Sequence, residues 1–189
     1  HRFSETWSHP AARMAEMVRA INAIWATWEG EGPLDFRGRF YDHTLMIPAF
    51  DPGPNPFGPP PVFTGGVGPR VTEVAGEVAD GFLVHPFHTP GSLRATTLAA
   101  LERGLDQSGR TLEDFEVVVV TMVVTWDEGD GDAEAAARAS LADQLAFYGS
   151  TPAYAPTLEA AGLGDLHPEL NRLSKEGRWT EMAALVPDS

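Results

Sequence analysis

The sequence predicts an α/β fold, and two observations support this class. Three largely apolar stretches, at residues 62–64, 82–84 and 115–126, alternate with stretches whose apolar residues recur every three or four positions. Strands that are apolar on both faces are typical of a parallel sheet covered by helices. The alternation of strand and helix then gives right-handed crossovers between parallel strands.

Composition limits what the chain can be and bind. Its 189 residues fall short of the about 250 of a complete (β/α)₈ barrel, yet they suffice for one domain that buries roughly 70% of its unfolded surface. The formal net charge of −14 argues against nucleic acid and anionic membranes as partners. There is no cysteine, no apolar stretch of membrane-spanning length and no apolar signal core at the N-terminus. We therefore expect a soluble cytoplasmic protein.

The first predicted element is an amphipathic helix over residues 10–28. Pro10 suits its first turn, and Gly30 lies where the helix should stop. Spacings of three and four residues place one apolar set on a single face, namely Met14, Met17, Val18, Ile21, Ile24, Trp25 and Trp28.

Residues 33–61 have a different character. The polar-aromatic stretch 36–41 predicts a hairpin. Seven prolines follow between Pro48 and Pro61, and their fixed φ angles and missing N–H donors exclude a helix or a central strand. We expect an extended loop, and because long loops on α/β scaffolds often carry specificity, we expect it to form a wall of a substrate pocket.

The rest of the chain alternates regularly. The expected elements are, in order, a strand at 62–64, a helix opened by Gly68 and Pro69, a strand at 82–84, a helix capped by Thr89 with Pro90 in its first turn, a strand at 115–126, a helix capped by Asp132 that runs to about Tyr148, and helical pieces at 168–174 and 180–185.

The most informative segment is the glycine-rich turn after the strand at 62–64. It reads Gly65, Gly66, Val67, Gly68, Pro69 and Arg70. Glycines let the backbone approach a ligand, amides in the first turn of a helix favour an anion, and the Arg70 guanidinium could fork onto a phosphate. The simpler interpretation is a tight strand-to-helix turn with no ligand. The pattern matches neither the dinucleotide fingerprint nor a P-loop.

Histidines follow the next strand. His85 ends the strand at 82–84, and the carboxyl ends of parallel strands are where active sites lie. We interpret His85 as a hydrogen-bond donor to the phosphate or the ring of a cofactor. His88 is close in sequence, but the intervening Pro86 disfavours helical ligand spacing and no third ligand is near, so we expect no metal site. Glu73 and Glu77, four residues apart on a helix, are expected to form a solvated face.

Three segments together resemble the luciferase-like monooxygenase superfamily, and within it the branch of oxidoreductases that depend on the deazaflavin coenzyme F420. These are Phe36–Tyr41, Pro59–Arg70 and Ala75–Phe82. The stretches Phe147–Tyr154 and Leu170–Lys175 fit the same branch, so the resemblance spans nearly the whole chain.

The resemblance implies a TIM barrel, present here as a partial barrel. Residues 10–28 would be its fourth helix, and the three strands would be strands five to seven. In this family the loop after strand five contributes amides to the cofactor phosphate, which implicates Gly65, Gly66, Val67, Gly68 and Arg70. The end of strand six implicates His85 and Thr89.

The same resemblance places the proton-handling residues on strands one to four, which would precede His1, so no catalytic residue is assigned. The expected activity is hydride transfer between F420 and a small organic substrate, by a homo-oligomer at full length. Two alternatives stay open at this point. One is a monooxygenase of the same superfamily that uses FMN. The other is an inactive barrel fragment that needs its missing strands.

Overall fold

The structure, a computed structural model, describes residues 8–187. The chain divides into two compact units. The first, which we call the sheet unit, comprises His1–Leu83 and Ala99–Val118, and the second, the helical unit, comprises Val84–Leu98 and Val119–Ser189. Since two compact units can belong to one domain, the expectation of a single domain stays a prediction.

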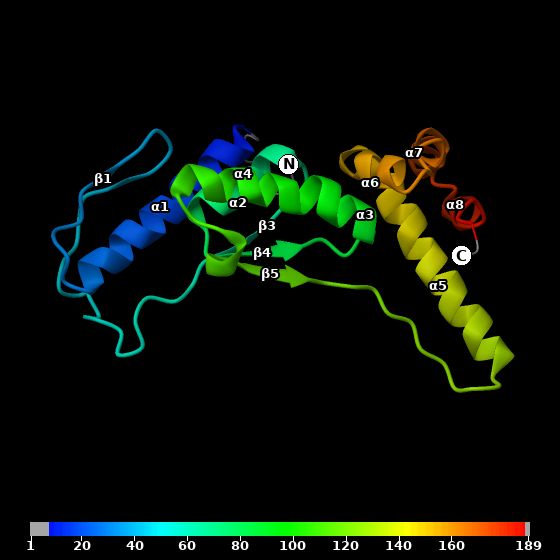
Figure 1. The fold of residues 1–189 in the computed structure, drawn as a ribbon, viewed down its shortest axis with the longest axis horizontal. Coiled ribbons are helices and arrows are strands. Elements are labelled where there is room, and N and C mark those ends of the chain that lie inside the picture. Colours follow the sequence, from blue (N-terminus) through cyan, green and yellow to red (C-terminus); the bar gives the residue numbers. More distant parts are fainter. Residues whose placement is uncertain (1–7, 188–189) are drawn as a thin grey trace. The chain divides into compact units, whose positions relative to one another are not determined.

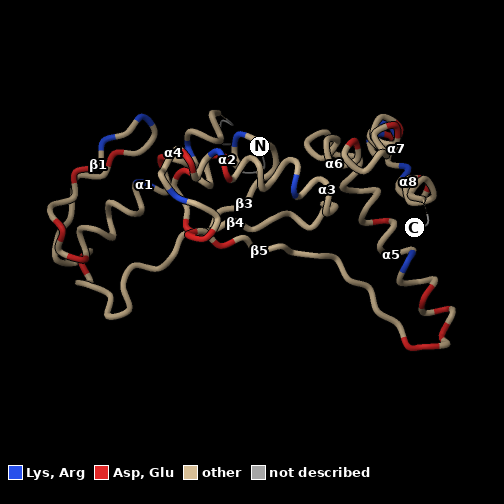
Figure 2. The backbone as a smooth tube through the Cα atoms, viewed as in Figure 1, with Lys and Arg blue, Asp and Glu red and all other residues tan. Residues whose placement is uncertain are grey.

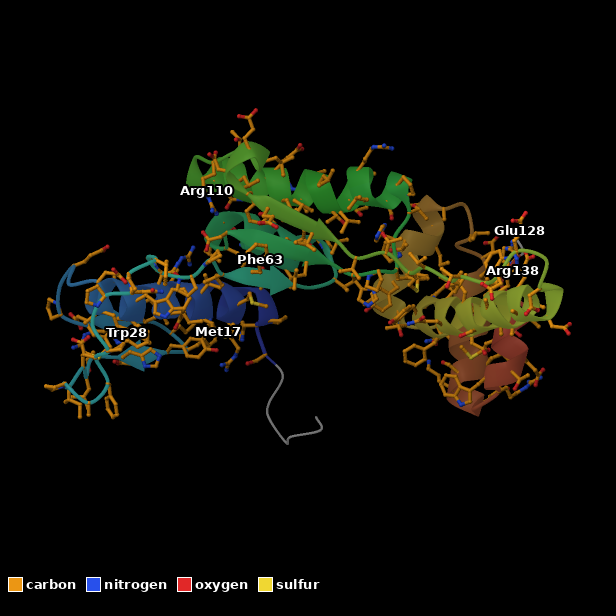
Figure 3. All side chains as sticks on the ribbon, turned by 90° about the horizontal axis from the view of Figure 1, so that it is seen from below. Met17, Trp28, Phe63, Arg110, Glu128 and Arg138 are labelled. Carbon is orange, nitrogen blue, oxygen red and sulfur yellow. The ribbon has the colours of Figure 1, made fainter. Side chains whose placement is uncertain are left out.

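The sheet unit begins with helix α1, Pro10–Trp28, which confirms the predicted helix at both ends. Its predicted apolar face is only partly right. Val18 is buried, but so are Ala15 and Ala20, whereas Met17 is 38% exposed. Small residues on this helix allow close packing that a count of large apolar side chains misses. Trp28, at the end of α1 (Figure 3), donates from Nε1 to the carbonyl oxygen of Phe50 at 2.9 Å.

The expected hairpin is present as antiparallel strands β1, Phe36–Arg37, and β2, Asp42–His43. Its turn is fixed to α1, because the Glu16 carboxylate accepts hydrogen bonds from the amides of Phe40 and Tyr41 at 2.6 and 2.8 Å. Residues 44–62 contain no helix or strand, as the prolines predict.

A three-stranded sheet confirms the α/β class (Figure 1). Its order is β3, Phe63–Gly65, then β4, Gly81–Val84, then β5, Glu116–Val119, and β3 and β4 are parallel. Thr64 pairs with Phe82 in register, and both side chains are buried. Leu83, on the opposite face, is 45% exposed. The prediction that the strands are buried on both faces is therefore wrong for the described residues. Within that part of the chain, only one face of the sheet is covered.

Helices α2, Pro69–Val78, and α4, Ala99–Ser108, cover that face. The two helices pack closely, because each has a glycine that contacts the backbone of the other. A Cβ added to Gly104 would collide with the carbonyl oxygen of Glu73, and one added to Gly76 would collide with that of Leu101. The short 3₁₀ helix η2, Leu112–Asp114, leads from α4 into β5. The buried apolar residues of this layer include Val74, Ala75, Ala79, Phe82, Ala100, Leu101, Leu105 and Phe115.

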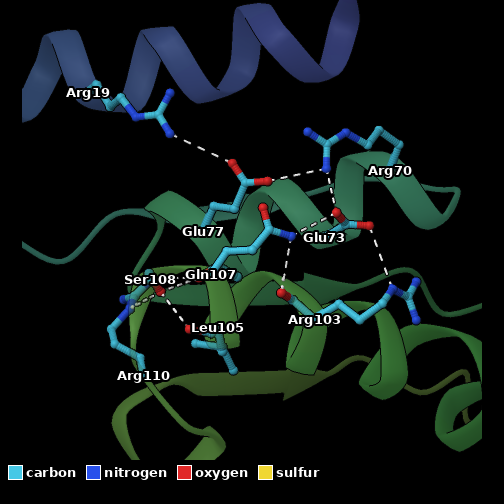
Figure 4. Close-up of polar contacts among 10 residues, drawn as sticks. Arg19, Arg70, Glu73, Glu77, Arg103, Leu105, Gln107, Ser108 and Arg110 are labelled. Atoms are coloured by element: carbon cyan, nitrogen blue, oxygen red, sulfur yellow. Dashed lines mark hydrogen bonds and ion pairs between the residues drawn. The ribbon is translucent and has the colours of Figure 1, made fainter.

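Arg110 closes the end of this helix pair. Its guanidinium donates to the carbonyl oxygens of Ala79 and Gly76, both at 2.7 Å. These are carbonyls at the C-terminal end of α2, which have no partner within their own helix. Arg110 therefore caps α2 from the segment that follows α4 (Figure 4).

The helical unit is built from helices of 3 to 19 residues around a core of its own. They are α3, Pro90–Ser92, the π-helix η1, Leu93–Leu98, α5, Gly131–Gly149, the 3₁₀ helix η3, Pro152–Tyr154, α6, Ala155–Ala160, α7, Leu166–Glu176, and α8, Trp179–Ala183. Its buried residues are Phe87, Ala146, Leu158, Leu170, Leu173 and Met182. No helix among residues 8–187 is both long and apolar enough to cross a bilayer.

Two predicted boundaries are wrong here. The strand expected to reach Trp126 ends at Val119, and Val123 beyond it is 75% exposed because no described strand covers it. The cap of α5 is Asp130, whose Oδ1 accepts from the amide of Ala133 at 2.9 Å, so Asp132 lies in the first turn instead. Figure 2 shows the acidic run at the start of α5.

Replacing Gly104 with alanine tests the contact between α2 and α4. The new methyl group meets backbone that cannot move aside, so we expect Gly104→Ala to lower the free energy of unfolding by about 2 kcal/mol. Gly131→Ala is the matched control, because nothing lies within 4 Å of its added Cβ. Urea unfolding of both variants measures the difference, and equal stabilities would contradict the glycine contact.

Candidate functional site

The glycine-rich turn lies at the carboxyl end of β3, where it leads directly into α2. Gly65 ends the strand and Gly68 precedes the helix with φ of 98°, a value that L-residues rarely adopt. A Cβ on Gly66 would lie 2.5 Å from the Val71 side chain. The structure therefore brings Gly65, Gly66, Val67 and Gly68 together as a turn in which only Val67 has a side chain.

The N-terminus of α2 is open to an anion. Gly68 offers no side-chain cap and Pro69 has no N–H, so no side chain among the described residues satisfies the first-turn amides. No acidic residue lies in that turn. Backbone amides and the helix dipole both favour negative charge at such a position.

Arg70 is engaged by carboxylates of its own helix. Its Nη1 lies 2.5 Å from Oε1 of Glu73 and 3.2 Å from Oε1 of Glu77. The side chain is 61% exposed, and it extends along α2 in Figure 4. A phosphate would compete with these two glutamates for the guanidinium, and a phosphate contact by Arg70 stays a prediction.

Glu73 and Glu77 do not form the solvated face that their spacing suggested. Their side chains are only 19% and 14% exposed, because arginines from three helices surround them (Figure 4). Arg19 of α1 lies 3.7 Å from Glu77, and Arg103 of α4 lies 3.7 Å from Glu73. Three arginines and two glutamates give this ion-pair network a charge of +1.

Glu73 contacts three side chains, those of Arg70, Arg103 and Gln107. Gln107 donates a hydrogen bond to its Oε1 at 3.0 Å. This bond and the guanidinium groups of Arg70 and Arg103 hold the pKa of Glu73 below its ordinary value. A carboxyl whose pKa is lower in the folded than in the unfolded protein stabilises the fold at pH values above its unfolded-state pKa. This contribution is lost as the pH falls through the folded-state pKa.

Glu73→Gln should therefore destabilise the protein at pH 7, and its effect should shrink at pH 3, because the wild-type carboxyl gains protons as the pH falls. Urea unfolding at the two pH values measures this. Glu134→Gln, in an exposed pair with Arg138 on α5, is the matched control with a small effect at both values. A destabilisation by Glu73→Gln that is equal at pH 7 and pH 3 would refute the charge-based role.

His85 directly follows β4 in the chain and belongs to the helical unit. Its ring stacks on Tyr154, with centroids 4.7 Å apart and planes at 27°, and is nearly perpendicular to the Tyr148 ring, with centroids 4.8 Å apart and planes at 88°. The Phe87 ring packs against both tyrosines, with its centroid 5.8 Å from that of Tyr148 and 5.7 Å from that of Tyr154. We call Phe87, Tyr148 and Tyr154 the aromatic cage of His85.

The other two candidates in this segment have structural partners. Thr89 caps α3 as predicted, since its Oγ1 accepts from the amide of Ser92 at 3.1 Å and its own amide donates to Ser92 Oγ at 2.9 Å. Its contact to a cofactor stays a prediction. The Nε2 of His88 lies 3.1 Å from the carbonyl oxygen of Val120, so Nε2 carries the proton and the buried Nδ1 has no partner among the described residues.

The proline-rich segment approaches the opposite end of β3. It follows α1 and leads into the amino end of the strand, where the Val62 amide donates to Asp80 Oδ2 at 2.7 Å. The glycine turn leaves the carboxyl end. A role of residues 33–61 as a pocket wall stays a prediction.

Sequence reasoning missed the partners that come from distant segments. Arg19, Arg103 and Gln107 carried no motif, and only packing brings them to Glu73 and Glu77. Tyr148 and Tyr154 lie in a stretch that fits the resembled family, but nothing in their spacing predicts contact with a histidine more than 60 residues earlier.

The family model for luciferase-like monooxygenases matches residues 1–189. The chain therefore belongs to the luciferase-like monooxygenase family, which confirms the resemblance. A solved structure of coenzyme F420-dependent tetrahydromethanopterin reductase from Methanopyrus kandleri superposes with a TM-score of 0.69 at 22% identity, over 100% of this chain and 50% of that chain. The fold is thus a partial barrel of the luciferase-like type.

Two curated relatives illustrate the range of similarity. An uncharacterized protein of Mycobacterium tuberculosis (strain ATCC 25618 / H37Rv) is 50% identical over 188 residues, which are 99% of this chain and 54% of that protein. An F420-dependent glucose-6-phosphate dehydrogenase of Nakamurella multipartita is 31% identical over 121 residues, 64% of this chain and 34% of that enzyme. The chain spans about half the length of the first of these relatives.

Proposed function

We propose that the protein binds coenzyme F420 and, at full length, transfers a hydride between this deazaflavin and a small organic substrate. Relatives named as F420-dependent enzymes support the cofactor. The observation that carries the proposal is the bare glycine turn at the carboxyl end of β3, which opens onto the uncapped N-terminus of α2.

The residues present fit the phosphate of this cofactor. In the turn from Gly65 to Gly68, the three glycines have no side chain, so a ligand can approach the backbone. Val67 is the only one of these four residues with a Cβ. The first-turn amides of α2 supply donors without acidic neighbours in that turn. The +1 charge of the ion-pair network adds a favourable local field in a chain whose formal net charge is −14.

When bound, the deazaflavin supplies the hydride chemistry. The part of this chain is to bind and orient it. The turn holds the phosphate through backbone donors, which need no side-chain rearrangement, and the fixed φ of Gly68 sets the direction of the amides that follow. The proton-transfer groups of the reaction are not assigned to residues of this chain.

Two substitutions test the phosphate site. Gly68→Ala places a side chain where φ is 98° and should distort the turn, weakening F420 binding about 10-fold. Arg70→Ala should weaken it about 3-fold or more, because it removes one cation from the network beside the turn. Fluorescence titration of the purified full-length protein measures both affinities.

Arg138→Ala is the matched control, since Arg138 pairs with Glu134 of its own helix α5 and is not among the residues of the proposed phosphate site, and it should leave the affinity unchanged. Unchanged F420 affinity in both Gly68→Ala and Arg70→Ala would refute the phosphate site. The same titration with FMN decides between the cofactors: tighter binding of FMN than of F420 by the wild-type protein would replace the F420 assignment.

A further inference from the structure

One ring nitrogen of His85 already takes part in a hydrogen bond within the protein. The backbone amide of Phe87 donates to its Nδ1 at 3.2 Å. An atom that accepts a hydrogen bond carries the lone pair, so in the neutral ring the hydrogen is on Nε2. No residue between 8 and 187 accepts a hydrogen bond from Nε2 of His85. The geometry thus leaves one N–H donor available on this side chain.

The surroundings of the ring favour its neutral form. Protonation at Nδ1 would place two donors, the ring N–H and the Phe87 amide, against each other. The titratable groups that face the ring are His88 on its own segment, Tyr148 of α5 and Tyr154 of η3, and none of them is a carboxylate. Burial lowers the pKa of His85, and the nearby His88 lowers it further.

Tyr154 is held in its uncharged form as well. Burial raises the pKa of Tyr154, and the proximity of Tyr148 raises it further. The Tyr154 ring stacks on the imidazole and the Tyr148 ring stands perpendicular to it, so the two rings restrict both the tilt and the position of His85. Phe87 contributes to the same cluster and is itself buried in the core of the helical unit.

We propose that His85 is a neutral Nε2–H donor to a carbonyl oxygen of the deazaflavin ring, and that Tyr148 and Tyr154 are positioning residues that hold it in this tautomer. A neutral donor adds a hydrogen bond but no charge, so it suits a ring carbonyl better than a phosphate, for which cationic donors are stronger. This assignment rests on the proposed function, because it takes F420 as the cofactor. Of the two cofactor contacts expected for His85, the phosphate or the ring, the proposal selects the deazaflavin ring.

The role of the aromatic cage can be tested without any ligand. Two-bond ¹H–¹⁵N spectra of the full-length protein labelled with ¹⁵N-histidine report tautomer and titration of each ring, and His85→Gln assigns the His85 signals. We expect the Nε2–H tautomer and a pKa below that of an exposed histidine. Tyr154→Phe should preserve both, whereas Tyr154→Leu should move the pKa of His85 toward its ordinary value.

The Nδ1–H tautomer, or a His85 titration that Tyr154→Leu leaves unchanged, would overturn the positioning role. Far-UV circular dichroism of Tyr154→Leu verifies folding. If that variant does not fold, Tyr148→Phe and Tyr148→Leu make the same comparison at the perpendicular ring.

The ring contact is tested with two probes, F420 and the same deazaflavin without its phosphate and acidic tail. His85→Leu should weaken binding of both by about 5- to 10-fold, and His85→Gln, which retains an N–H donor, should restore most of the loss. A loss seen with F420 alone would assign His85 to the phosphate, and no loss with either would remove it from the site; both overturn the proposal. If the wild-type protein binds neither probe, the proposed function fails, while the spectra still decide the role of the cage.

Discussion

The sheet unit depends on the backbone contact between α2 and α4. Gly76 and Gly104 face the opposite helix, and neither position has room for a methyl group. At this separation Ser108 and Arg110 reach the carbonyl oxygen of Gly76, at 3.3 and 2.7 Å, so the C-terminal end of α2 is capped from outside the helix. The close approach therefore fixes the helix layer over the covered face of the sheet. It also fixes the direction in which α2 leaves β3.

The same contact prepares the anion site at the other end of α2. It brings Arg103 and Gln107 of α4 to Glu73, and Glu77 meets Arg19 of α1. Two carboxylates that would otherwise repel an anion are thereby neutralised, and the group retains a charge of +1. This matters in a chain that has a net charge of −14 and Lys175 as its single lysine, because the anionic cofactor must be held by arginine and backbone amides. In the part of the chain that the structure describes, no side chain caps the amides at the N-terminus of α2.

Local signals were sufficient for the elements that local chemistry determines. Pro10 and Gly30 predicted both ends of α1, the prolines predicted the extended segment, and Thr89 predicted the cap of α3. Features set by distant neighbours could not be predicted. The strand ending at Val119 required knowledge of which strands lie beside it, and the partners of Glu73 and His85 come from helices far along the chain. The glycine turn was found by its composition, but the ion pairs that occupy Arg70 were not.

A crystal structure of the full-length protein with F420 tests the central claim most directly, namely that the turn from Gly65 to Gly68 and the first turn of α2 form the phosphate site. The account predicts phosphate oxygens within hydrogen-bonding distance of these backbone amides, with no carboxylate at the anion. A phosphate held elsewhere, with the turn free of ligand, would contradict it.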